Sequence, residues 1–226
     1  MTHAPRTPPI LPGLVFTLAL AGCSPTGIDM TNAAPSSDAP ARVVASEFRH
    51  NPKPRQAHRL TVKIDGAPGP FSQLLAMAQF DVANKECLPP PDANPGGYTS
   101  AVPTEDVEIP LTRVSDTEYQ GTFYVDQMLD EDYYGRGVCR WELVEARLKM
   151  KASGAESETL FIPHAPRAAL LAGEPQVNYF NKNTYPSVEM PNYPDIGTLD
   201  RTQFGPSIRD SDLFTITLAT QPGAAP

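Results

Sequence analysis

The sequence has few of the residues that usually carry enzyme or metal chemistry. Only 3 of its 226 residues are cysteine and 4 are histidine, and they are scattered along the chain. Zinc sites need cysteine and histidine at short spacings, so neither a metal nor another cofactor is expected. The Gly-x-Ser-x-Gly elbow of α/β-hydrolases is missing, and His164 follows a proline in a segment typical of a loop. No catalytic residue is therefore predicted.

Positive charge is also scarce. Lysine and arginine total 18 against 26 aspartates and glutamates, which gives a net charge of −8. Binding to nucleic acid requires cations that neutralise phosphates, and binding to anionic lipid headgroups requires a polybasic patch. Neither is expected here, whereas an acidic chain is compatible with a basic protein partner.

No apolar run is long enough to cross a bilayer as a helix, which takes about 20 residues. The apolar stretch Leu14–Ala21 is much shorter; it follows Arg6 and is followed by Gly22-Cys23. A short apolar core between a positive residue and small residues is typical of a signal peptide. Residues 1–22 are therefore predicted to be a cleaved leader.

The end of this leader, Leu20-Ala21-Gly22-Cys23, resembles the lipobox of bacterial lipoproteins. The resemblance implies that Cys23 receives a diacylglycerol, that the leader is cut before it, and that the new amino terminus is acylated. Each buried methylene contributes about 0.8 kcal/mol, so two or three acyl chains would hold the protein durably at a membrane. Ser24 stands where an aspartate would imply retention in the inner membrane. The resemblance thus implies a periplasm-facing lipoprotein of the outer membrane in a Gram-negative cell envelope; an ordinary secreted protein is the alternative.

Residues 23–47 are predicted to be an acylated terminus and flexible tether, because they are rich in Ser, Pro, Ala, Thr and Asn. A flexible segment of this length has a root-mean-square span of about 25 Å. Residues 48–226 are predicted to form a single domain.

The predicted domain shows the period-two apolar alternation of half-buried strands. The segments are 59–65, 72–82, 107–111, 119–125, 137–150, 160–162, 177–179 and 214–218. Segment 72–82 also allows a short helix capped by Ser72, although a strand is favoured. Turn residues and many of the 26 prolines separate the segments. The pattern predicts an all-β antiparallel sandwich of about seven strands with long irregular loops.

Two of these segments carry finer predictions. Segments 107–111 and 119–125 are predicted to form a hairpin with each other. In segment 137–150 the apolar residues change parity near Val144, which predicts a β-bulge or a bend between two sheets.

Cys87 and Cys139 remain once Cys23 is acylated, and two thiols in an oxidising compartment are expected to pair. Their spacing is not the Cys-x-x-Cys of redox pairs. Trp141 follows the second cysteine instead of lying between the two, so the sandwich is not assigned to the immunoglobulin family.

Two aromatic stretches are candidate partner-binding surfaces. The first has two glycines and isolated positive charge, and the second is a long, weakly patterned region between residues 163 and 212. Packing in the core is the alternative for the aromatic members. The candidates are Tyr133, Tyr134, Arg136, Tyr179, Phe180, Tyr185 and Tyr193.

The acidic run Asp126–Asp132 has two interpretations. Neighbouring carboxylates can hold calcium, but the run lacks the spacing and glycine of an EF-hand. A solvated turn between two strands is the favoured interpretation.

These features together favour a membrane-anchored, non-catalytic protein-binding module. Within that class we expect an inhibitor or immunity protein directed against a secreted cell-envelope hydrolase. The alternatives are a structural or assembly factor of an envelope or secretion complex, and a carboxylate-dependent envelope hydrolase.

Overall fold

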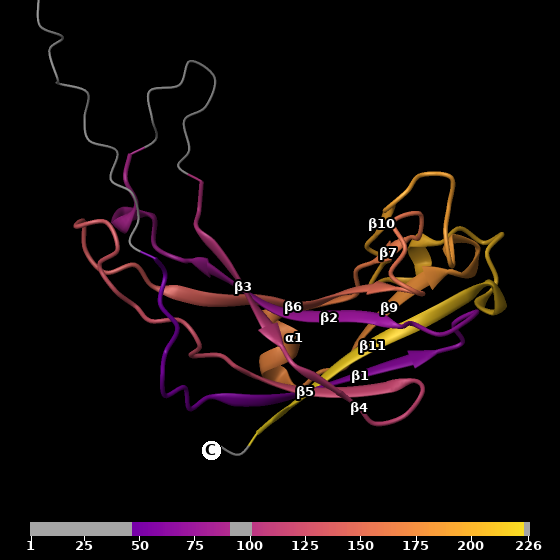
Figure 1. The fold of residues 1–226 in the computed structure, drawn as a ribbon, viewed down its shortest axis with the longest axis horizontal. Helices are drawn as coiled ribbons and strands as arrows, with labels where there is room; N and C mark the ends of the chain where they lie inside the picture. The colour runs from indigo at the N-terminus through magenta and orange to yellow at the C-terminus, as the bar shows by residue number, and fades with distance from the viewer. Residues whose placement is uncertain (1–46, 91–100, 224–226) are drawn as a thin grey trace, which may run out of the picture. The chain divides into compact units, whose positions relative to one another are not determined.

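Two β-sheets form the framework of the chain that the computed structural model describes, residues 47–90 and 101–223 (Figure 1). The first sheet has the order β4 (Leu111–Arg113), β5 (Glu118–Tyr124), β1 (Ala57–Asp65), β11 (Leu213–Pro222) and β9 (Gln176–Asn181). The second has the order β10 (Pro194–Asp195), β7 (Leu160–Phe161), β6 (Trp141–Lys151), β2 (Gln73–Val82) and β3 (Thr104–Ile109), with β8 (His164–Pro166) also paired to β6. All strand pairs are antiparallel except β10 with β7.

The chain is therefore an all-β antiparallel sandwich, as the alternation predicts. Seven of its strands have six residues or more. The remaining elements are short: α1 (Arg167–Ala172), η1 (Lys85–Cys87), η2 (Lys182–Thr184), η3 (Arg201–Gln203) and η4 (Asp210–Asp212). No helix in the described ranges is long and apolar enough to cross a bilayer. The predicted leader, Cys23 and the tether up to residue 46 lie outside the described residues.

Alternation along the strands sets the core. In β1, Leu60, Val62 and Ile64 face inward, and β11 contributes Ile216 and Leu218 from the neighbouring strand. Residues 73–82 form strand β2, so the alternative of a helix capped by Ser72 is wrong.

The predicted bulge is present in β6. Gln79 of β2 pairs with Glu145, but the next residue, Phe80, pairs with Leu143, so Val144 has no partner on β2. The extra residue moves the buried set of β6 to the other parity, which keeps Leu143 and Ala146 both facing the core.

The predicted hairpin is wrong for its first half. The segment breaks at Pro110: β3 pairs with β2 in one sheet, and only β4 pairs with β5 in the other. Proline cannot donate to a ladder, so the chain leaves one sheet there and joins the second. The crossing runs close over Gly121, where a Cβ would lie 2.8 Å from the Pro110 carbonyl oxygen, so only glycine fits.

Candidate functional site

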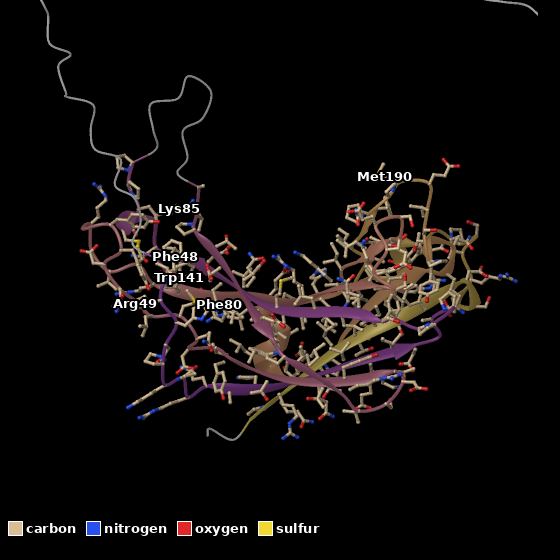
Figure 2. All side chains as sticks on the ribbon, in the orientation of Figure 1. Phe48, Arg49, Phe80, Lys85, Trp141 and Met190 are labelled. Atoms are coloured by element: carbon tan, nitrogen blue, oxygen red, sulfur yellow. A yellow bond between two sulfur atoms is a disulfide. The ribbon has the colours of Figure 1, made fainter. Side chains whose placement is uncertain are left out.

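The strands run between two ends that carry different loops. We call one the disulfide end, formed by residues 47–56, 83–90 and 125–140, and the other the loop end, formed by residues 65–72, 152–159 and 182–212. Figure 2 shows Phe48 and Trp141 together at the disulfide end and Met190 at the tip of the loop end. The predicted contact residues are divided between these two ends.

The predicted disulfide is present and gives the first end its name. Cys87 and Cys139 are bonded and buried, and 52 residues of sequence separate them. Asn84 ties the same two segments together, since its amide donates to the Val138 carbonyl (3.0 Å) and accepts from the Arg140 N–H (2.7 Å).

Most of the aromatic stretch at the disulfide end faces inward. The Tyr133 ring packs edge-on against Phe48 at 5.2 Å, and its hydroxyl donates to the Leu129 carbonyl at 2.6 Å. Tyr133 is buried, so its assignment as a contact residue is wrong. Tyr134 is half-buried against the core, and this burial raises the pKa of its hydroxyl. Arg136 is exposed.

The acidic run next to these residues accepts hydrogen bonds from the backbone. The Asp126 carboxylate accepts from the N–H groups of Arg55 (2.8 Å) and Gln56 (2.9 Å). Asp130 accepts from the Trp141 N–H at 2.9 Å, and Glu131 forms an ion pair with Arg49. The run lies between β5 and β6 with Asp130 and Asp132 exposed, as the solvated-turn interpretation predicts, and its carboxylates also hold three chain segments together.

The last carboxylate of the run organises the glycine-containing loop. Desolvation opposes ionisation of Asp132, but hydrogen bonds from the N–H groups of Arg136 and Gly137 lower its pKa below the usual value. No group of three or more His, Cys, Asp or Glu side chains in residues 47–90 and 101–223 is arranged to hold a metal ion.

Two of the candidates at the loop end are structural. Phe180 is fully buried between Phe161 (5.5 Å between ring centroids) and Phe214 (5.3 Å), so its assignment as a contact residue is wrong. Tyr185 is half-buried and donates its hydroxyl to the Pro70 carbonyl at 2.5 Å, which joins two loops. Desolvation, with the nearby Glu158 carboxylate, raises the pKa of Tyr185.

Tyr193 is exposed, and it is accompanied by two large apolar residues that the sequence patterns did not single out. Met190 and Ile196 are 60% and 61% exposed. We call Met190, Tyr193 and Ile196 the apolar tip. The one signal for it in the sequence is a set of apolar residues among prolines, with no alternation that would bury them.

The apolar tip is fixed to the sandwich by a buried lysine. Lys151, at the end of β6, is only 8% exposed; its ammonium donates to the Ala155 carbonyl (2.8 Å) and to the Asn192 side-chain oxygen (2.5 Å). The Leu160 N–H donates to the Tyr193 carbonyl at 2.8 Å. These bonds hold the loop from two sides, so its exposed side chains are presented on a defined backbone.

Tyr179 lines a hollow of about 330 Å³ on the same end. Leu213 and Phe214 provide its apolar floor. Its cations are already engaged, since Lys182 donates to the Ser211 carbonyl (2.9 Å) and Arg201 to Asp210 (2.7 Å). The hollow is therefore suited to an apolar side chain rather than to an anion.

A second hollow of about 320 Å³ shares Gly66 with the first and is lined by Ile64, Phe71 and Arg113. The loop end thus combines a protruding apolar tip with two small hollows. Comparisons of the chain with protein-family models, curated proteins and solved structures found no match.

Proposed function

We propose that this protein is a non-catalytic binding lipoprotein of the Gram-negative cell envelope, and that its loop end holds a partner protein. The observation that carries the proposal is the apolar tip: three large apolar side chains are exposed within seven residues of a loop that a buried lysine fixes in place. Exposed apolar patches on soluble proteins mark interaction sites, and a preorganised loop loses little entropy on binding.

The proposed anchor fits this arrangement. The described chain starts at residue 47, at the disulfide end, where Phe48 packs on Trp141. β6 alone, with 11 residues, covers about 35 Å toward the loop end, at about 3.3 Å per residue. Residue 47, where the described chain begins, and the apolar tip therefore lie at opposite ends of the sandwich.

Within this class, an inhibitor or immunity protein against a secreted envelope hydrolase is our narrower proposal. The net charge of −8 favours fast capture of a basic partner. The hollows at the loop end suit apolar side chains from such a partner, because their own charges are already paired.

Site-specific photo-crosslinking in the native host tests the binding surface. A photoreactive residue at Met190 should give an adduct of defined mass with one envelope protein. The matched control is Val138, which is 51% exposed at the disulfide end. Equal adducts at the two positions, or none at Met190, would contradict the proposal.

The anchor has a separate test. Mass spectrometry of the protein from its native host should show a diacylglyceryl and an acyl group on an amino-terminal Cys23, and Cys23→Ser should release the protein from membranes. An unmodified terminus would remove the lipoprotein assignment and leave the loop end to be tested by itself.

A further inference from the structure

β3 forms one edge of the second sheet and is paired on one side only. Its neighbour is β2, in a register that runs from Ala76 opposite Ile109 to Asp81 opposite Thr104. In the described residues, the strand order of the second sheet ends at β3. Figure 1 shows the chain passing from β3 directly into β4 of the other sheet.

The register shows which backbone groups of β3 are free. The Val82 N–H donates to the Pro103 carbonyl at 3.1 Å, which makes this a hydrogen-bonded pair. Hydrogen-bonded pairs recur at every second residue of an antiparallel ladder. Glu105, Val107 and Ile109 therefore bond to β2, while the N–H and C=O groups of Thr104, Asp106 and Glu108 point away from it. Within the described ranges, no backbone hydrogen bond reaches these three residues from outside the ladder.

This edge lacks several of the devices that protect sheet edges from further pairing. Natural edges are protected by charged side chains, above all lysine, and by proline, bulges, short length or a covering element; of these, β3 has acidic side chains. β3 has no lysine or proline within it and pairs in register along its length; prolines stand only beside it, at Pro103 and Pro110. Six residues with three outward N–H groups are a template for one more strand.

The charge around the edge selects what could pair there. β3 carries Glu105, Asp106 and Glu108, and Asp81 lies beside it on β2. Arg147 provides positive charge near the edge, but it is already paired with Asp106 (2.7 Å) and Glu145 (3.1 Å). The imidazole of His50 lies 3.7 Å from Glu105. A second copy of β3 would place acidic residues opposite acidic residues, which is destabilising.

We propose that the β3 edge binds a basic, extended segment of another protein as an added strand. Backbone hydrogen bonds to Thr104, Asp106 and Glu108 fix the register of the added strand. Lysine or arginine at alternate positions of that strand pairs with the carboxylates of β3. This surface is separate from the apolar tip, so the inference stands or falls independently of the binding function proposed for the loop end.

The test uses the full chain with Cys23→Ser and a labelled probe peptide of alternating lysine and valine, about eight residues long and thus able to span β3. Hydrogen exchange should show new protection of the amides of Thr104, Asp106 and Glu108 when the peptide is added. The amides of Glu105 and Val107 already bond to β2 and should not change. A peptide with glutamate in place of lysine should give no protection.

Three variants sharpen the result. Glu108→Pro removes one outward N–H without breaking the ladder to β2, and should weaken peptide binding by about tenfold or more. Glu108→Lys keeps the N–H but reverses the charge, and should shift preference toward the glutamate peptide. Glu174→Gln removes an exposed carboxylate elsewhere on the molecule and should leave the affinity unchanged.

Two results would overturn the inference. One is equal affinity of the unsubstituted chain for the lysine and glutamate peptides, and the other is protection that spares the three outward amides. If Glu108→Pro fails to fold, the inference is still tested by the peptide preference of Glu108→Lys and by the hydrogen-exchange pattern of the unsubstituted chain. Dimers of the chain that protect the same amides would show a second copy as the occupant instead, and would also refute it.

Discussion

The two ends of the sandwich are stabilised in different ways and differ in what they expose. At the disulfide end, a covalent bond and a series of carboxylates fasten the loops, and Tyr133 is turned into the core beside Trp141. At the loop end, packed aromatic rings and the buried Lys151 fix the backbone, while Met190 and Ile196 remain in solvent. The comparison teaches that an aromatic-rich loop is not by itself a contact surface. Whether its side chains are available to a partner depends on what they pack against within the fold.

Removing the disulfide should lower the stability of the protein more than any other change, and the loss should be confined to the disulfide end. Cys87→Ala with Cys139→Ala frees a loop of 52 residues, which should lower the free energy of unfolding by about 4 kcal/mol on the chain-entropy model. Denaturant titration measures the loss, and hydrogen exchange should place the increased opening at residues 83–90 and 125–140. Equal loss of protection at the loop end would mean that the two ends are not independent.

A substitution at the loop end should have the next largest effect. Gly197 has φ +61°, and a Cβ there would lie 2.7 Å from the Phe180 ring. Gly197→Ala should therefore destabilise the protein by about 2–3 kcal/mol. Thermal unfolding measures the loss; Gly205→Ala, where no atom lies within 4 Å of the new Cβ, is the matched control. Equal Tm values for the two variants would refute the packing argument.

Neutralising a single carboxylate at the disulfide end should lower the stability by a smaller amount. Asp126→Asn weakens the bonds to the N–H groups of Arg55 and Gln56, and should lower stability by about 1 kcal/mol. Asp116→Asn is the control, because Asp116 is 95% exposed and its ion pair with Arg113 is a surface pair of little value. Chemical denaturation of both variants at neutral pH makes the comparison, and a larger loss for Asp116→Asn would contradict it.

The smallest effect should come from protonation of His58. Desolvation lowers the pKa of this imidazole, whose Nδ1 is buried without a partner and whose ring stacks on Phe123. The unfolded chain therefore binds the proton more tightly, and stability should fall as the pH drops below about 6.5 toward the lowered pKa of the folded state. His58→Phe should flatten this part of the Tm-against-pH curve. If the slope of Tm against pH is unchanged in His58→Phe, the pH dependence in this range comes from other groups.

Strands with long alternation were predictable because the pattern repeats over many residues. β1 and β11 follow from their own alternation, and the parity change near Val144 gave the bulge in β6. The break at Pro110 was not predictable, since Val107, Ile109 and Leu111 keep one parity although they belong to two sheets. Strands of two or three residues carry too few positions to show a period.

The candidate site was harder to predict because exposure depends on partners far away in the sequence. Tyr133 is buried by Phe48, and Phe180 by Phe214; neither partner is a sequence neighbour. Asp126 likewise bonds to Arg55 and Gln56, about 70 residues earlier. Local patterns locate aromatic and acidic clusters, but only the fold separates those that pack from those that face solvent.

The position of β1 has a consequence for how the protein is made. β1 lies between β5 and β11, so the first strand of the domain pairs along most of its length with the last. The first sheet cannot be completed until residues 213–222 have been synthesised, and contacts of such high contact order form slowly. Until β11 has emerged, β1 of a nascent chain can pair only with β5, so the centre of the first sheet is among the last parts of this fold to form.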